Sequence, residues 1–126
     1  GIRIDYNVKP DIHFTGDKDK IIQLLTALIE NAISYCNADG LIRVSLEKCN
    51  RKIQLSVYNT GIGVKEDERE LIFERFYRVD KVRDRKNEHH GLGLSIVKHI
   101  AQLYEIQIEV SSELGEGSCF RLIRHK

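Results

Sequence analysis

The apolar residues of the chain follow two spacings, the two-residue period of strands and the period of about 3.6 residues that marks helices. Alternation predicts strands centred on Ile2/Ile4/Tyr6, Ile42/Val44/Leu46, Ile53/Leu55/Val57, Ile106/Ile108/Val110 and Phe120/Leu122. The first of these strands is expected to be half-buried, with its apolar side chains toward the core. Polar residues 48–52 connect the second strand to the third, which predicts a hairpin.

Two longer segments have helical spacing. The first follows Asp17, which stands where a helix N-cap would, and its apolar positions are Ile21, Leu24, Leu25, Leu28 and Ala32. The second opens at residues 91–94, and its apolar positions are Leu94, Val97, Ile100 and Ala101. Helices and antiparallel hairpins in this order predict an α+β fold, a two-layer α/β sandwich in which about three helices cover one face of a mixed β-sheet.

Between these helices the chain becomes strongly charged from residue 65 to residue 86. A short apolar and aromatic island, residues 71–73 with Phe76 and Tyr77, interrupts this segment. Residues 79–90 are expected to form a mobile loop, because only Val79 and Val82 are available to anchor them.

Size and charge limit the possible functions. The chain has 126 residues, 41% hydrophobic and 31% charged, which fits one domain over residues 1–126. Its 20 Lys and Arg against 19 Asp and Glu give no general electrostatic reason to bind nucleic acid or an anionic membrane, so a phosphate ligand needs a local arrangement. The three cysteines form no CxxC pair, and we expect reduced thiols in a cytosolic setting. The absence of Met and the start at Gly1 favour a fragment of a longer protein.

Three glycine pairs, Gly61/Gly63, Gly91/Gly93 and Gly115/Gly117, stand between the predicted elements. Neither of the first two completes GxGxxG, and no GxxxxGK[ST] occurs, so Rossmann and P-loop interpretations both fail. The second pair opens directly into a helix, where free backbone N–H groups and the positive end of the helix dipole suit a phosphate. A tight loop-to-helix junction that binds nothing fits the spacing equally well.

The first helix carries a second candidate site. Ala27, Asn31, Ser34 and Tyr35 share one helical face, and polar Asn31 interrupts the apolar pattern. A neutral amide oxygen can complete the shell of a Mg²⁺ ion whose other ligands are waters and nucleotide phosphates. The helix alone leaves open the alternative that backbone or solvent satisfies this amide.

Taken in order, five segments resemble the ATP-binding domain of sensor histidine kinases, part of the superfamily that includes gyrase, Hsp90 and MutL-type ATPases. They are residues 28–35 (the N box), 59–63 (the first glycine box), 72–78 (the F box), 91–98 (the second glycine box) and 115–120 (the closing motif). The F box resembles a histidine kinase feature that the ATPase relatives lack. The resemblance implies a Bergerat-type ATP-binding fold.

The resemblance also implies a role for individual residues in a site for ATP and Mg²⁺. Asn31 would ligate the Mg²⁺ ion, and Arg75 or Arg78 would neutralise the γ-phosphate during transfer. The remaining nucleotide-binding residues would be Tyr35 and Ile62 near the adenine, Asn59, Gly61 and Gly63 of the first glycine box, and the phosphate-binding amides of Gly91, Leu92, Gly93 and Leu94. Residues 79–90 would be the lid over the nucleotide, with Phe73, Phe76 and Tyr77 either anchoring the lid or docking the helix that carries the phosphoacceptor.

Several positions depart from the family pattern. Asn59 replaces the adenine-binding aspartate, so the acceptor is uncharged and binding is expected to weaken without being lost. Ala27 stands at the first Asn of the N box and Ser34 at its usual Lys. Glu88 and His89 replace lid glycines. Hydrolytic relatives place a glutamate one turn before the magnesium Asn, and because Ala27 cannot act as a general base, hydrolysis is disfavoured.

The implied function is transfer of the γ-phosphoryl group of ATP to a histidine on a separate dimerisation domain of the same kinase. None of the five histidines here lies in a segment that resembles the phosphoacceptor helix. The expected partners are that domain and a cognate response regulator, without nucleic acid and without direct membrane contact, in the cytoplasmic part of a membrane-anchored parent protein. Two alternatives stay open: a degenerate nucleotide-binding regulatory module without transfer activity, and a serine kinase of the anti-sigma-factor type.

Overall fold

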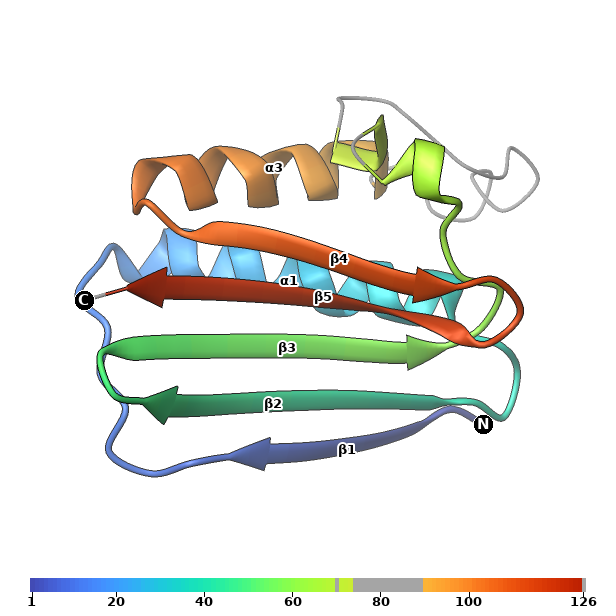
Figure 1. The fold of residues 1–126 in the computed structure, drawn as a ribbon, viewed down its shortest axis with the longest axis horizontal. Coiled ribbons are helices and arrows are strands. Elements are labelled where there is room, and N and C mark those ends of the chain that lie inside the picture. The colour runs from blue at the N-terminus through green and yellow to red at the C-terminus, as the bar shows by residue number, and fades with distance from the viewer. Residues whose placement is uncertain (70, 74–89, 126) are drawn as a thin grey trace.

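A computed structural model describes residues 1–69, 71–73 and 90–125. The strands are β1 (Arg3–Val8), β2 (Leu41–Cys49), β3 (Lys52–Thr60), β4 (Gln107–Glu113) and β5 (Gly117–His125), and they form one sheet in the order β1-β2-β3-β5-β4. β1 runs parallel to β2, and the other neighbouring strands are antiparallel. The helices are α1 (Lys18–Tyr35), α3 (His90–Leu103) and the 3₁₀ turns η1 (Glu66–Glu68) and η2 (Leu71–Phe73). The predicted α+β sandwich with a mixed sheet and helices on one side is confirmed (Figure 1).

α1 begins where the sequence predicts. The carboxylate of Asp17 accepts hydrogen bonds from the backbone N–H groups of Asp19, at 2.8 Å, and Lys20, at 3.3 Å, so it caps the helix. The apolar residues at helical spacing then face the sheet, and Leu24, Leu28 and Ala32 are buried. The capping residue and the helical period together fix the start and the inward face of α1.

The predicted hairpin forms between β2 and β3, with a shorter turn than expected. Cys49 pairs with Lys52, which leaves a two-residue turn at Asn50 and Arg51. Asn50 has a φ of 57°, in the left-handed region that this residue tolerates better than most. The polar residues 48–52 therefore extend both strands instead of forming a longer loop.

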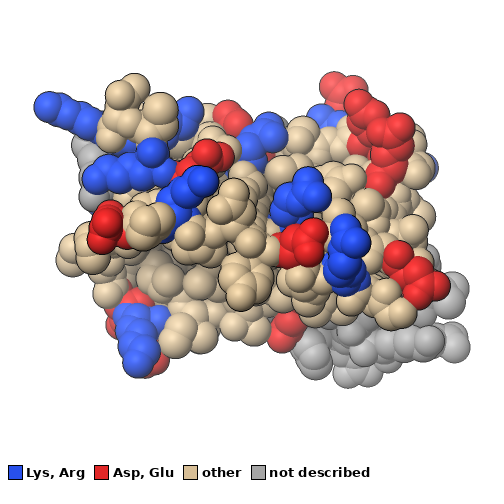
Figure 2. All heavy atoms as spheres, turned by 90° about the horizontal axis from the view of Figure 1, so that it is seen from below, with Lys and Arg blue, Asp and Glu red and all other residues tan. Residues whose placement is uncertain are grey.

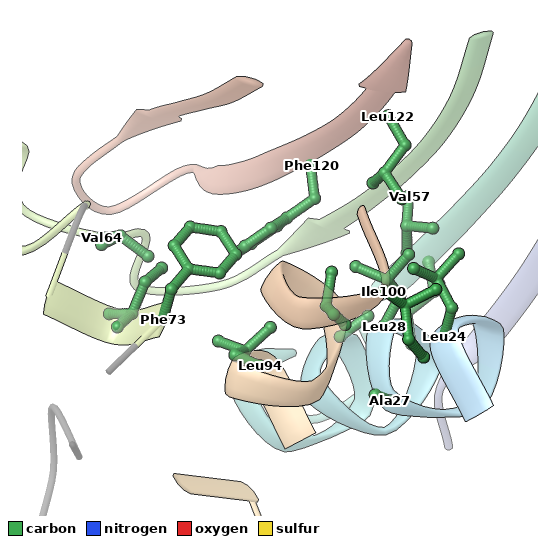
Figure 3. Close-up of a cluster of buried hydrophobic side chains, with 14 of the residues drawn as sticks. Leu24, Ala27, Leu28, Val57, Val64, Phe73, Leu94, Ile100, Phe120 and Leu122 are labelled. Atoms are coloured by element: carbon green, nitrogen blue, oxygen red, sulfur yellow. The ribbon is translucent and has the colours of Figure 1, made fainter. Parts of the chain in front are cut away.

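The core lies between the sheet and the helix layer. Leu24 and Leu28 of α1 and Ile100 of α3 meet Val57 and Leu122 of the sheet (Figure 3). Burial of each such side chain contributes about 1.5–3 kcal/mol. η2 joins the same core through Phe73, whose ring stands edge-on to that of Phe120 at a centroid distance of 5.9 Å.

The prediction that the first strand is half-buried is wrong. Ile4 is 50% exposed and Tyr6 is 78% exposed, although Ile4 pairs with Ile42, whose side chain is fully buried. β1 is an edge strand, whereas α1 packs over β3 and α3 packs over β4, which lies at the opposite edge of the sheet (Figure 1). The apolar face of β1 therefore points to the correct side of the sheet but has no helix above it.

Figure 2 shows the molecule from below the view of Figure 1. On this face, basic and acidic side chains are interspersed, as the near-zero net charge leads one to expect. None of the helices among the described residues is long and apolar enough to cross a membrane.

The predicted loop at 79–90 lies outside the described residues except for His90, which is the first residue of α3. α3 thus begins one residue before the predicted opening at Gly91.

Candidate functional site

Three of the segments that carry predicted site residues come together at one end of the molecule. α1 and α3 run in opposite directions, so the end of α1 lies beside the start of α3 (Figure 1). A Cβ added to Gly93 would lie 3.7 Å from the Cβ of Ala27. Cys36, just after α1, forms a bridge with Gly61 at the end of β3. Residues separated by about sixty positions in sequence therefore border one region.

Asn31 is the buried polar residue of α1. Its residue surface is only 4% exposed, and no hydrogen bond to its amide is formed by any described residue. Its amide atoms are not among the fully enclosed polar atoms that lack a partner in the described part of the chain. The alternative that the protein backbone satisfies this amide is therefore not supported. Because these amide atoms are not fully enclosed, they remain accessible to solvent or to a ligand at this position.

Asn59 is held in one orientation at the end of β3. Its residue surface is 1% exposed, its Nδ2 donates to the Thr60 carbonyl oxygen at 3.1 Å, and its Oδ1 accepts from the Ser118 hydroxyl at 3.0 Å. Because the Thr60 carbonyl can only accept, the amide nitrogen must face it. Oδ1 has two acceptor positions, so one remains for a donor on a ligand.

Two glycines of the segment after β3 are required by geometry. A Cβ on Gly61 would collide with the backbone carbonyl oxygen of Tyr35. Gly63 has a φ of 80°, and a Cβ there would lie 2.7 Å from the Ser112 hydroxyl. The first residue allows close approach of α1, and the second allows a left-handed turn that other residues adopt at a cost.

The β4–β5 turn supports this glycine segment. The N–H of Gly61 donates to the carbonyl oxygen of Glu116 at 3.1 Å, and the N–H of Gly115 donates to that of Ile62 at 2.9 Å. Below the turn, the Ser112 hydroxyl accepts from the N–H of Val64 at 2.6 Å and donates to the carbonyl of Gly117 at 2.8 Å. These hydrogen bonds from the β4–β5 turn and Ser112 therefore hold the first glycine segment in place.

The sequence patterns did not identify the serine and threonine side chains that support this region. Ser118 holds Asn59, Ser112 holds Val64, and the Thr60 hydroxyl accepts from the N–H of Leu41 at 2.9 Å. No local pattern distinguishes these hydroxyl residues from others on strands. Their role depends on strand register, which sets which side chains face each other.

The start of α3 presents the predicted phosphate-binding segment. The first N–H groups of a helix have no partner within the helix, and the positive end of the helix dipole lies there. With α3 beginning at His90, Gly91, Leu92 and Gly93 belong to this first turn. Leu94 is buried in the core beside Val97, so it anchors the turn from below. The first turn of α3 is therefore held against the core by Leu94, and its backbone N–H groups have no partner within the helix.

The adenine-side residues and the F box are only partly described. Tyr35 is half-buried, and the side chain of Ile62 is exposed next to the glycine segment. Arg75, Arg78 and the predicted lid before His90 lie outside the described residues. Phe73 is a core residue, so its side chain packs inside the domain and is not available to dock a partner helix.

Two titrating groups lie near the closing motif. A hydrogen bond with Glu113, reinforced by the like charge of that residue, raises the pKa of Glu116. Burial raises the pKa of the Cys119 thiol, and nearby Arg121 acts in the opposite direction. Among the described residues, no three His, Cys, Asp or Glu side chains meet as a metal-binding group.

Comparison with known families matches residues 16–125 to the family described as histidine kinase-, DNA gyrase B- and HSP90-like ATPase. The sensor-like histidine kinase SenX3 of Mycobacterium tuberculosis is 36% identical over 121 residues, which are 96% of this chain and 30% of SenX3. The sensor histidine kinase YkoH of Bacillus subtilis is 42% identical over 110 residues, which are 87% of this chain and 24% of YkoH. The chain therefore spans less than a third of the length of these relatives.

Solved structures with the same fold include two histidine kinases. Full-length ShkA in complex with AMPPNP superposes with a TM-score of 0.82 at 30% identity, over 98% of this chain and 25% of ShkA. The nucleotide-free catalytic domain of the histidine kinase ThkA superposes with a TM-score of 0.82 at 27% identity, over 99% of this chain and 79% of the ThkA chain.

Proposed function

Because the chain belongs to the family of histidine kinase-, DNA gyrase B- and HSP90-like ATPases, as its five ordered segments predicted, we propose that it binds Mg·ATP between α1, the end of β3 and the start of α3. The same proposal assigns it transfer of the γ-phosphoryl group to a histidine on a separate dimerisation domain. The observation that carries this proposal is the buried Asn31 residue, whose amide has no partner among the described residues and which lies one turn after Ala27, the residue that faces Gly93 of α3.

The residues of this region fit a magnesium nucleotide. Mg²⁺ usually keeps several waters and binds substrate phosphates, so one protein oxygen is sufficient. The Asn31 amide oxygen would be that ligand. The amides of Gly91, Leu92, Gly93 and Leu94 would bind phosphate oxygens at the positive end of α3. A bound metal ion and its phosphates would supply charge neutralisation at the transferred group.

The base would lie on the other side of the glycine segment. The free acceptor position on Asn59 Oδ1 is suited to an exocyclic amine such as that of adenine. Tyr35 and Ile62 would contact the ring, and Gly61 and Gly63 would keep the backbone close to it. The neutral Asn59 holds the base with less strength than a carboxylate would.

Phosphoryl transfer, not hydrolysis, fits the side chain one turn before Asn31. Ala27 is buried, and its Cβ faces the start of α3, so no carboxylate can act as a general base from that position. Transfer between positioned partners needs alignment and charge neutralisation above all. Arg75 or Arg78 of the F box would neutralise the γ-phosphate during this step.

The partners proposed are the dimerisation and phosphoacceptor domain of the same kinase and a cognate response regulator. The relatives named above are sensor histidine kinases several times longer than this chain, which supports a place for it within a larger kinase. We place the domain in the cytoplasmic part of a membrane-anchored parent protein. ShkA, crystallised with AMPPNP, supports ATP as the ligand.

Calorimetric titration with Mg·ADP tests the site. The unmodified domain should release heat with saturable binding, and Asn31→Ala should weaken Mg-dependent binding at least tenfold, whereas binding of ADP without Mg²⁺ should change much less. Gln23→Ala is the matched control, because Gln23 is an exposed amide on the same helix. Equal Mg·ADP affinities for Asn31→Ala and Gln23→Ala would show that the magnesium assignment is wrong.

A second experiment tests transfer. Radiolabelled ATP with the full cytoplasmic part of the parent should label a histidine outside residues 1–126, and the label should be lost in acid. An acid-stable label would instead support the serine kinase alternative. Nucleotide binding without any label would support the regulatory module, the alternative that the departures at Ala27, Ser34 and Asn59 favour.

A further inference from the structure

A cavity of about 180 Å³ lies at the end of the molecule opposite the glycine segments. It is lined by the first half of α1, the segment before that helix and the sheet near the β2–β3 turn. Its walls are almost entirely apolar and include Ile12, Leu24, Leu46 and Leu55. Of the described residues that line it, Arg124 alone is charged.

The outer wall of this cavity is built by fixed aromatic contacts. The ring of Phe14 stands edge-on to that of Tyr104 at a centroid distance of 5.3 Å. The Tyr104 hydroxyl in turn accepts from the N–H of Asp17 at 2.7 Å, so the residue that follows α3 holds the segment before α1 in place. The Arg124 guanidinium also lies over the Phe14 ring, with its central carbon 4.7 Å from the ring centroid.

The surroundings of Arg124 differ from those of the neighbouring arginine on β5. Arg121 faces the opposite side of the sheet, where its Nε is 3.3 Å from a carboxylate oxygen of Glu109. Arg124 lies on the side of Phe120 and Leu122, because side chains alternate along a strand. It is half-buried, and no carboxylate within the described residues pairs with it. This position therefore has, beside an apolar cavity, a positive charge that contacts the Phe14 ring but has no carboxylate partner within the described residues.

We propose that this cavity binds a small amphipathic monocarboxylate, with its apolar tail among the leucine and isoleucine side chains and its carboxylate on the Arg124 guanidinium. An apolar cavity of roughly 150 Å³ in another protein accommodates benzene, so a tail of about six carbons or one aromatic ring fits this volume. Guanidinium and carboxylate groups form charge-assisted hydrogen bonds in a planar, paired geometry. The site is separate from the nucleotide region and does not depend on the proposed kinase activity.

Titration of the ¹⁵N-labelled domain with sodium hexanoate tests the proposal by amide chemical shifts. We expect saturable shifts at Phe14, Leu24 and Leu55 and no shifts at Gly61 and Gly63. Hexan-1-ol, which has the same tail without the charge, should bind about tenfold more weakly, and hexylammonium should bind more weakly still. Raising the salt concentration should weaken hexanoate binding more than hexan-1-ol binding.

Two variants and one control separate the charge from the cavity. Arg124→Gln should remove the preference for hexanoate over hexan-1-ol, whereas Arg121→Gln, the same change on the opposite face of β5, should keep it. Leu55→Phe should fill the cavity and weaken both ligands. Equal affinities of the unmodified domain for hexanoate and hexan-1-ol, or shifts that do not saturate at these wall residues, would overturn the proposal even if a variant failed to fold.

Discussion

Replacing Asn59 with aspartate changes one buried atom and should have opposite effects on stability and on nucleotide binding. In the unmodified domain, Nδ2 donates to the Thr60 carbonyl oxygen at 3.1 Å and Oδ1 accepts from the Ser118 hydroxyl at 3.0 Å. The substitution turns the donor into an acceptor that faces a carbonyl oxygen. It also places a charge at a position that is only 1% exposed.

The magnitude follows from these contacts. Leaving a buried charge without its full set of partners costs about 3–5 kcal/mol. The Ser118 hydrogen bond becomes charge-assisted and returns about 1–2 kcal/mol. We therefore expect Asn59→Asp to lower the free energy of unfolding by about 2 kcal/mol. A charged acceptor for an exocyclic amine is roughly twice as strong as a neutral one, so the affinity for Mg·ADP should rise about tenfold.

Urea unfolding followed by circular dichroism measures the first effect, and calorimetry with Mg·ADP measures the second. Asn7→Asp is the control, because Asn7 is exposed on β1 and the same chemical change there should alter stability by less than about 0.5 kcal/mol. Unchanged stability of Asn59→Asp would show that the hydrogen bond to Thr60 is not formed. An unchanged or lower affinity would show that Asn59 does not face the base.

Two substitutions and one alkylation experiment test the supporting structure. Gly63→Ala should destabilise the domain by about 1–2 kcal/mol, measured by urea unfolding, because Gly63 has a φ of 80° and an added Cβ would lie 2.7 Å from the Ser112 hydroxyl. Gly115→Ala, with a φ of 84° but open space around the added Cβ, should cost less. Asp17→Ala should cost about 1 kcal/mol by removing the cap of α1, and Asp17→Asn should restore most of it. Iodoacetamide should alkylate exposed Cys49 faster than Cys119, and the difference should shrink as pH rises, because burial raises the pKa of Cys119 and its thiolate forms later; equal rates in the folded state at neutral pH would contradict this.

Local patterns in the sequence were sufficient to predict the five strands and the two long helices of this fold, but not the 3₁₀ turns η1 and η2. Asp17 followed by apolar residues at helical spacing predicted both the start and the inner face of α1, because a cap and a helix face depend on residues within a few positions of each other. Alternation predicted all five strands, and the ordered glycine and asparagine segments predicted the family. The roles of Asn31, Gly93 and the other nucleotide-site residues stay predictions that the titrations above address.

The tertiary structure decided what lies on each surface that the patterns left undefined. β1 has the alternation of a half-buried strand, yet Tyr6 is exposed, because edge position and helix placement depend on the whole sheet and not on the strand itself. The orientation of Asn59 depends on strand register with Ser118, fifty-nine positions away. Arg124 reads as an ordinary surface cation in the sequence, and only the packing of Phe14 over the end of the sheet places it beside an apolar cavity. The period of a helix or strand depends on neighbouring residues in the sequence. The hydrogen-bond partner of Asn59, the exposure of Tyr6 and the position of Arg124 beside the cavity depend on contacts between distant segments.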